Sequence, residues 1–354
     1  MSLEGRKSEQ LQLHLLHSLK QTTISTNISK MEFPNPALIR GAADIPVNSA
    51  SPIFTFTPVT IPAKDRRVDL DIKVTAPATG ESLPIILLSH GHGPSNYLSS
   101  LKGYGPLVDW WASHGFVVIQ PTHLSSRQLA FELNSESIRE LFMDERVKDM
   151  VRILDSLDTI EKTVPLLKGR LDKSKIAIAG HSLGSLTASI LMGATNTDPR
   201  DGAKQQTADK RIKAGVVFGA VGSGGDDLSE AGRNMLSFFD PKFDTMTTPS
   251  LIVWGDQDIS PHLTSRGADW HQDPYLLSPG PKASFKITEG KHGFGGISGW
   301  DALECQDESP ERLAAVQRVS WAYLRSQLYP EDDSWKKAQK VIGEHAEIGS
   351  IEEK

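Results

Sequence analysis

Short apolar runs alternate with segments of helical periodicity between about residues 50 and 330, and this alternation limits the possible folds more than any other feature of the chain. The run Pro84–Ser89 is almost wholly apolar, as is typical of a central strand buried on both faces. Lys175–Ala179 and Leu251–Trp254 are similar runs, and helical segments such as Pro310–Leu328 follow them. The pattern predicts an α/β fold with a mostly parallel central sheet flanked by helices.

Two further strands are predicted at the start of this region. Ile53–Val59 and Leu70–Ala76 alternate apolar and polar residues, so we expect an antiparallel pair with one exposed face. The other predicted strands are Phe116–Gln120, Ala214–Phe218 and Ser284–Thr288, and the other predicted helices are Gly105–His114, a long helix that ends at Leu157, and Leu183–Gly193.

The two ends of the chain differ from this middle region. Residues 1–45 are polar and rich in Ser, Thr, Asn and Gln, so they are predicted to be an extension outside the fold. Residues 46–330 are predicted to form one domain, and residues 331–354 a mostly charged tail.

Composition limits the possible partners and compartments. Lys plus Arg is 38 and Asp plus Glu is 44, a net charge of −6 that gives no reason to expect nucleic acid as a partner. Cys305 is the only cysteine, which excludes an intrachain disulfide and any zinc site with two cysteine ligands. No apolar run approaches the roughly 20 residues of a membrane-spanning helix, and residues 1–20 make a poor signal-peptide core. These features favour a cytoplasmic protein and leave its oligomeric state open.

One pentapeptide, GHSLG at residues 180–184, matches the pattern G-x-S-x-G. It follows the predicted strand Lys175–Ala179 and opens a predicted helix, which is the context of a nucleophile elbow. The tight turn leaves no room for side chains at Gly180 and Gly184, and the helix start supplies free N–H groups. Ser182 is therefore the predicted nucleophile, and the alternative is an ordinary strand-to-helix loop that happens to contain glycines.

A serine hydroxyl needs a base that removes its proton, and the base needs an acid that orients it. In this type of fold the acid and then the base follow the serine along the chain. The run Leu251–Trp254 is followed by Gly-Asp-Gln-Asp, so Asp258 is the predicted acid and Asp256 the alternative acid or a turn former. His292, in a glycine-rich loop after the last predicted strand, is the predicted base. Two other histidines follow Asp258 too closely and are predicted to be surface residues, His262 and His271.

The tetrahedral intermediate of acyl transfer carries an oxyanion, which needs two N–H donors fixed in advance. The backbone of Leu183, directly after the serine, is one predicted donor. The loop after Pro84–Ser89 reads His-Gly-His-Gly, and its glycines allow the N–H of His92 to turn inward as the second donor. The alternative is a metal cluster of three histidines, which no carboxylate accompanies: His90, His92 and His181. We expect no metal.

Three stretches resemble a known group of enzymes: SHGHG at residues 89–93, WASHGFVVIQPTH at 111–123 and DKSKIAIAGHSLG at 172–184. They resemble the platelet-activating-factor acetylhydrolase and chlorophyllase-like branch of the α/β-hydrolases, and are similar to dienelactone-hydrolase-like proteins and bacterial cutinases. The resemblance covers roughly residues 50–328. It implies an α/β-hydrolase fold and a Ser-Asp-His esterase that acts on carboxylic esters without a cofactor.

The chain departs from the acetylhydrolase pattern at the acid. In that branch the acid follows the strand directly after the nucleophile helix, but here that strand, Ala214–Val221, has no Asp at its end. Asp226 and Asp227 come later, in a glycine-rich loop. The acid is therefore predicted after the following strand, as in cutinases, and phospholipid specificity is not carried over.

Two segments are predicted to be able to cover the site as a small lid, residues 124–145 and 222–248. Their apolar residues either line a substrate pocket or anchor the loops, and the candidates for lining are Phe142, Met235, Phe238 and Phe239. No basic cluster near them indicates a phosphorylated or strongly acidic substrate. A medium-sized, fairly apolar ester is therefore the predicted small-molecule partner.

Three classes of function remain open. The predicted function is hydrolysis of a carboxylic ester. The same triad could instead serve a lactonase, thioesterase, amidase or C–C bond hydrolase. The third class is a non-catalytic ligand-binding protein on the hydrolase fold, against which a complete triad with two oxyanion donors argues.

Overall fold

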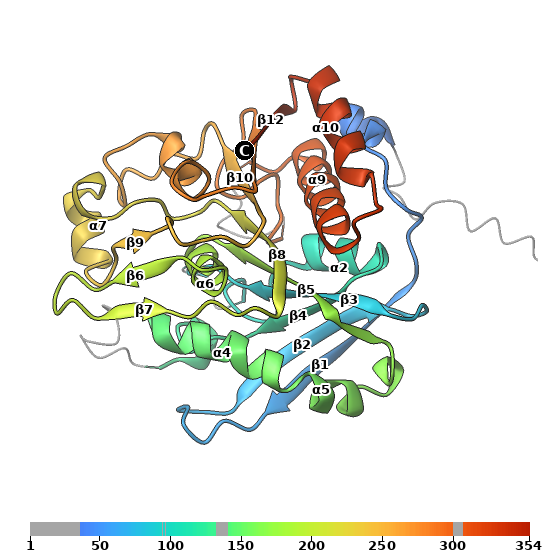
Figure 1. The fold of residues 1–354 in the computed structure, drawn as a ribbon, viewed down its shortest axis with the longest axis horizontal. Helices are drawn as coiled ribbons and strands as arrows, with labels where there is room; N and C mark the ends of the chain where they lie inside the picture. Colours follow the sequence, from blue (N-terminus) through green and yellow to red (C-terminus); the bar gives the residue numbers. More distant parts are fainter. Residues whose placement is uncertain (1–35, 94, 96, 132–140, 300–306) are drawn as a thin grey trace, which may run out of the picture. The chain divides into compact units, whose positions relative to one another are not determined.

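The computed structural model describes residues 36–93, 95, 97–131, 141–299 and 307–354. From residue 36 onward these residues belong to one compact unit. Its centre is a nine-stranded sheet with the order β1-β2-β4-β3-β5-β8-β10-β11-β12, and helices lie on both faces (Figure 1). The predicted fold class, a mostly parallel sheet flanked by helices, is confirmed.

The sheet is parallel in its middle and antiparallel at both edges. The parallel strands, in sheet order, are β4 (Val117–Pro121), β3 (Leu83–Ser89), β5 (Leu171–His181), β8 (Ile212–Phe218), β10 (Ser250–Gly255) and β11 (Lys282–Ile287). The antiparallel strands are β1 (Ile53–Ile61) and β2 (Leu70–Pro77) at one edge and β12 (Gly349–Glu353) at the other. The predicted antiparallel pair near the start of the chain is thus present as β1 and β2.

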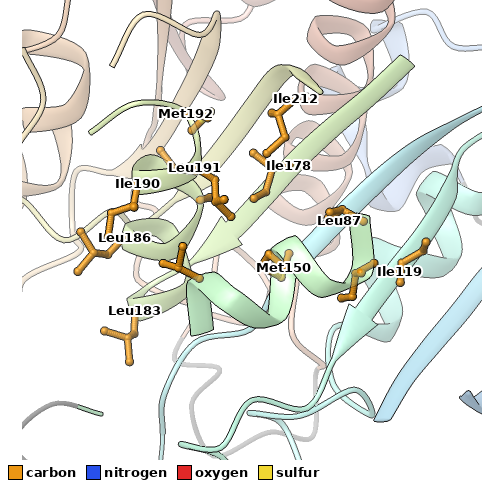
Figure 2. Packing of buried hydrophobic residues seen from close by; sticks show 14 of the residues in the cluster. Leu87, Ile119, Met150, Ile178, Leu183, Leu186, Ile190, Leu191, Met192 and Ile212 are labelled. Carbon is orange, nitrogen blue, oxygen red and sulfur yellow. The ribbon is translucent and has the colours of Figure 1, made fainter. Parts of the chain in front are cut away.

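Alternate residues of each central strand face two separate hydrophobic clusters. In β3, Ile85 and Leu87 pack toward one cluster, whereas Ile86 and Leu88 pack toward the other. The first cluster includes residues of α4 (Met143–Asp155), α5 (Leu157–Thr163) and α6 (Leu183–Leu191), and the second those of α2 (Gly105–Ser113), α9 (Pro310–Leu328) and α10 (Ser334–Glu344). Figure 2 shows part of the first cluster, to which Met150 of α4 belongs together with Leu87 and Ile178 of the sheet.

The end of the chain is part of the domain, which corrects the expectation of a charged tail at residues 331–354. Helix α10 buries Trp335, Ala338 and Ile342 against the core, and β12 extends the sheet beside β11. The charged residues of α10 lie on its outer face and dominate the composition of the segment. Composition alone therefore did not reveal the narrow apolar stripe on the inner face.

The predicted extension at residues 1–45 is also corrected, because its last ten residues are part of the domain. Residues 1–35 lie outside the described residues. The short 3-10 helices η1 (Pro36–Leu38) and η2 (Arg40–Asp44) follow, and Ile39, Ala42 and Ile45 are buried among the residues of α2 and α9. Residues 36–45 therefore pack on the domain.

The remaining elements are short and were not predicted. A separate small sheet has the order β7-β6-β9. The elements are η3 (Arg127–Leu129), η4 (Pro165–Leu167), β6 (Thr195–Thr197), β7 (Lys204–Gln206), η5 (Gly225–Asp227), α7 (Glu230–Met235), β9 (Pro241–Lys242), η6 (Ala268–Gln272) and α8 (Asp273–Leu276). Within the described ranges, none of the helices has the length and apolar character needed to cross a membrane.

Candidate active site

Ser182 lies at the sharp turn between β5 and α6. Its backbone angles are φ 53° and ψ −123°, a conformation that residues with a side chain rarely adopt. Its N–H donates to the carbonyl of Phe218 at 3.0 Å, which ties the turn to the end of β8. Its side chain is half-buried and lines a cavity of about 260 Å³. This strained turn between strand and helix has the geometry of a nucleophile elbow.

The two glycines of the pentapeptide make this turn possible. A Cβ on Gly180 would lie 2.0 Å from the carbonyl oxygen of Gly184, and a Cβ on Gly184 would lie 2.1 Å from that of Ser89. Neither distance is compatible with a side chain, because both neighbours are backbone atoms. The glycines therefore let α6 pack directly against the ends of β5 and β3.

His292 and Asp258 face each other beside Ser182. The loop after β10 carries Asp258 and the loop after β11 carries His292, and the Nδ1–H of His292 donates to Oδ2 of Asp258 at 2.8 Å. Backbone bonds join the two loops, because the N–H of Gln257 donates to the carbonyl of Gly290 at 3.0 Å. All three predicted residues line the same cavity.

The charges of this pair support each other. Burial disfavours the imidazolium of His292, but the charge and hydrogen bond of Asp258, with a further contribution from Asp307, outweigh burial and raise the pKa of His292 above its ordinary value. Burial also disfavours the carboxylate of Asp258, yet His292 and His271 hold the pKa of Asp258 far below its usual range. Asp258 is thus ionised, and it favours the protonated form of His292.

The alternative acid lies elsewhere. Among the described residues, Asp256 makes no hydrogen bond to His292, and its Oδ1 has no hydrogen-bond partner. In the glycine-rich loop after β8, Asp227 pairs with Arg266 at 3.0 Å. The structure therefore places Asp258, rather than either of these carboxylates, against the histidine.

The loop after β3 has its peptide groups fixed by buried side chains. The Nδ1–H of His90 donates to the carbonyl of Gly91 at 2.6 Å, and Arg146 donates to the carbonyl of His90. In a trans peptide the N–H points opposite to the C=O, so the N–H of His92 points away from the buried His90 ring. A Cβ on Gly91 would lie 3.3 Å from Cβ of Ser182, which shows that this loop runs alongside Ser182.

The N–H of Leu183 is the second predicted donor and lies at the start of α6. The first N–H groups of a helix have no partner within the helix. Among the described residues, neither the N–H of Leu183 nor that of His92 has a hydrogen-bond acceptor. Both residues line the cavity with Ser182, so both donors are available to an oxyanion.

A second Ser-His-Asp arrangement lies beneath the loop and was not predicted. Oγ of Ser89 is 3.0 Å from Nε2 of His123, and Nδ1 of His123 is 2.9 Å from Oδ2 of Asp149. All three residues are fully buried, and Arg66 pairs with Asp149 at 2.9 Å. Because no substrate could reach this Ser89, the arrangement supports the loop and is not a second reaction centre.

His271 was predicted to be a surface residue, and this prediction was wrong. Its ring is buried, its Nδ1–H donates to the carbonyl of Ala220 at 2.6 Å, and its Nε2 lies 3.2 Å from Oδ1 of Asp258. His262, in contrast, is exposed and lines the cavity. No local sequence pattern identifies His271, because η6 reaches Asp258 only through the folding of the loop after β10.

The cavity at Ser182 is largely apolar, but its lining differs from the prediction. Met235 lines it, whereas Phe238 and Phe239 are buried in the core and Phe142 lies 5.2 Å from the guanidinium of Arg67. These aromatic side chains contact other parts of the protein and do not face the cavity. The apolar lining residues are Leu141, Leu183, Val221, Met235, Leu236, Ile259 and Leu263.

Both predicted covering segments contribute to this lining. Leu141 comes from residues 124–145, and Met235 and Leu236 come from residues 222–248. Residues 132–140 of the first segment lie outside the described residues.

Two of the three histidines in the alternative metal cluster have both ring nitrogens bonded to other partners. His90 uses Nδ1 on Gly91 and accepts the N–H of His123 at Nε2, while His181 bonds to Tyr104 and to the carbonyl of His292. The one potential ligand group found in the described ranges is Asp258, His271 and His292, with ligand atoms within 4.8 Å of one another. The hydrogen bond between His292 and Asp258 already uses two of those atoms.

The strand order, the elbow between β5 and α6, and the polar loops at the carboxyl ends of β3, β10 and β11 define an α/β-hydrolase. Residues 53–198 match the family model described as Chlorophyllase. The predicted resemblance to the chlorophyllase-like branch is therefore confirmed, and the chain is a carboxylic ester hydrolase. A search of curated proteins finds no match. The matched region contains Ser182 and the loop after β3, whereas Asp258 and His292 lie beyond it.

Proposed function

We propose that the chain hydrolyses a medium-sized, apolar carboxylic ester through Ser182, His292 and Asp258, with an acyl-enzyme intermediate. The observation that carries this proposal is the 2.8 Å hydrogen bond between His292 and Asp258 in the same cavity as the strained Ser182. A base held in one tautomer beside an exposed hydroxyl is the arrangement that activates serine.

The reaction proceeds in two halves. Nε2 of His292 takes the proton from the hydroxyl of Ser182 as its oxygen attacks the ester carbonyl carbon. The N–H groups of Leu183 and His92 bind the oxyanion, and the tetrahedral intermediate collapses when His292 gives the proton to the departing alcohol. Water then attacks the acyl-enzyme by the same route, which releases the acid and restores Ser182.

The cavity supports a neutral, apolar substrate. Its described lining contains no lysine or arginine, and its one carboxylate, Asp258, is hydrogen-bonded to His292. A phosphate or carboxylate on the substrate would therefore meet no lysine or arginine there. The volume of about 260 Å³ lies just below the range of roughly 300–1,000 Å³ typical of small-molecule sites. A short to medium acyl group fits this space.

A substrate panel tests the proposed reaction. We expect p-nitrophenyl esters of short to medium acyl chains to be hydrolysed faster than matched thioesters, lactones and anilides. If the protein hydrolyses one of those three faster than the ester, the proposed substrate would be that class instead of an ester. The Ser182→Ala variant is the control, and turnover that survives in it would rule out Ser182 as the nucleophile.

A variant at the cavity mouth tests the choice of substrate. The side chain of Ile259 lines the cavity and is 59% exposed, so Ile259→Asp should leave the fold intact. Partial burial of such a side chain contributes about 1 kcal/mol, so KM for an octanoate ester should rise roughly fivefold while acetate hydrolysis changes little. Leu166→Asp, at an equally exposed apolar residue outside the cavity lining, is the matched control. Equal effects on both esters would contradict an acyl pocket at Ile259.

A further inference from the structure

A buried chain of hydrogen bonds joins the three loops of the site. The N–H of Gly91, in the loop after β3, donates to Oη of Tyr104 at 2.9 Å. Oη of Tyr104 is 2.8 Å from Nδ1 of His181, and Nε2 of His181 is 2.9 Å from the carbonyl oxygen of His292. Tyr104 and His181 are both buried, so solvent does not compete for these bonds.

The donor and the acceptor of each of these hydrogen bonds can be assigned from the groups at the two ends, the N–H of Gly91 and the carbonyl of His292. The carbonyl of His292 can only accept, so Nε2 of His181 carries a hydrogen and donates it. Burial lowers the pKa of His181 to about 3, so the ring is neutral and its Nδ1 must accept. The hydroxyl of Tyr104 therefore donates to His181 while its oxygen accepts from Gly91.

These hydrogen bonds connect the parts of the site that must keep fixed distances from one another. Gly91 precedes the oxyanion donor His92, His181 precedes the nucleophile, and the last carbonyl belongs to the base itself. A shift of about 1 Å between such groups can cost a hundredfold in rate. Tyr104 itself is held in place, because its backbone N–H donates to the carbonyl of Ser298 at 3.0 Å and it precedes α2.

We infer that Tyr104 and His181 are positioning residues for the hydrolysis, and this inference rests on the proposed function. Neither side chain lines the cavity, so neither contacts the substrate. Their role is to set the spacing between the oxyanion donor, Ser182 and His292. The histidine at the second position of the pentapeptide thus has a purpose that the G-x-S-x-G pattern leaves unspecified.

Steady-state kinetics on the best ester of the panel tests the inference with four variants. Tyr104→Phe removes one hydroxyl, and His181→Leu removes both ring nitrogens. His181→Gln keeps one donor and one acceptor on a planar group. Tyr323→Phe changes a buried tyrosine of α9 and is the control.

Tyr104→Phe and His181→Leu should each lower kcat roughly 10- to 100-fold with KM changed less than about threefold. His181→Gln should recover much of the loss, and the double variant should be no slower than the slower single one, because both act through one chain of bonds. Melting temperatures show whether each variant is folded at the assay temperature. If His181→Leu does not fold, the kinetics of Tyr104→Phe and His181→Gln decide whether the inference holds.

The inference is overturned if kcat of Tyr104→Phe equals that of Tyr323→Phe, if the two losses add, or if KM rises as much as kcat falls. A wild-type protein that turns over no ester would instead refute the proposed function. The two failures are therefore distinguishable in one set of measurements.

Discussion

At the scale of single residues, the neighbours of Asp258 and His292 determine the charge and orientation of both side chains. Burial alone would make both charged forms unfavourable, yet the carboxylate and the imidazole compensate each other at 2.8 Å. Nε2 of His271 lies 3.2 Å from the other carboxylate oxygen. The acid therefore has both oxygens directed at histidines, which fixes its orientation toward the base.

The assignment of the acid predicts different outcomes for the two neighbouring aspartates. Asp258→Asn should lower kcat roughly 10³- to 10⁴-fold, because the amide cannot hold His292 in the tautomer that accepts the serine proton. Asp256→Asn should change kcat less than about threefold, since the side chain of Asp256 makes no hydrogen bond to His292. Ester hydrolysis by the two purified variants checks this. Loss of activity in Asp256→Asn alone would contradict the assignment.

The raised pKa of His292 predicts the acid side of the pH profile. The base works only when neutral, so kcat/KM should rise with pH, with a midpoint above the ordinary histidine value of about 6.5. In Asp258→Asn the favourable charge is lost and burial remains, so the midpoint should move to lower pH as the rate falls. A profile from pH 4 to 9 measures both. An unchanged or higher midpoint in the variant would contradict the electrostatic role of Asp258.

At the scale of elements, the site forms where β3, β5, β10 and β11 end. Parallel strands bring their carboxyl ends to one edge of the sheet, so loops far apart in sequence meet there. The order of strand, pentapeptide and helix was enough to predict that Ser182, Asp258 and His292 would lie together, and the three residues line one cavity. Local order could not reveal the contacts of Tyr104 or His271, because these depend on how whole loops pack.

The close approach of α6 to β3 predicts a strong effect of one methyl group. Gly184→Ala places a Cβ 2.1 Å from the carbonyl oxygen of Ser89, so it should destabilise the fold by about 1–3 kcal/mol and abolish activity. Gly343→Ala in α10 is the matched control. No atom lies within 4 Å of its new Cβ, and alanine should stabilise the helix by up to about 1 kcal/mol. Thermal unfolding should therefore shift in opposite directions, and a Gly184→Ala variant as stable as wild type would contradict the packing argument.

At the scale of the whole molecule, the parts predicted best were those with long, regular patterns. The strands β3, β4, β5, β8, β10 and β11 and the helix α9 appear within a few residues of their predicted bounds. The ends were interpreted less well, because residues 36–45 and α10 present only a few apolar residues each and their burial depends on surfaces that exist only in the folded domain. The residues that line the cavity were also predicted less well, because apolar residues of a loop can face either the core or the substrate.

The central claim is that the folded chain as a whole turns Ser182 into a nucleophile, and labelling by a fluorophosphonate tests this most directly. We expect the wild-type protein to gain one adduct, mapped by mass spectrometry to Ser182. We also expect that Ser182→Ala gains none, and that His292→Ala reacts at least about a hundredfold more slowly. An unlabelled wild-type protein, or an adduct on another residue, would contradict the central claim.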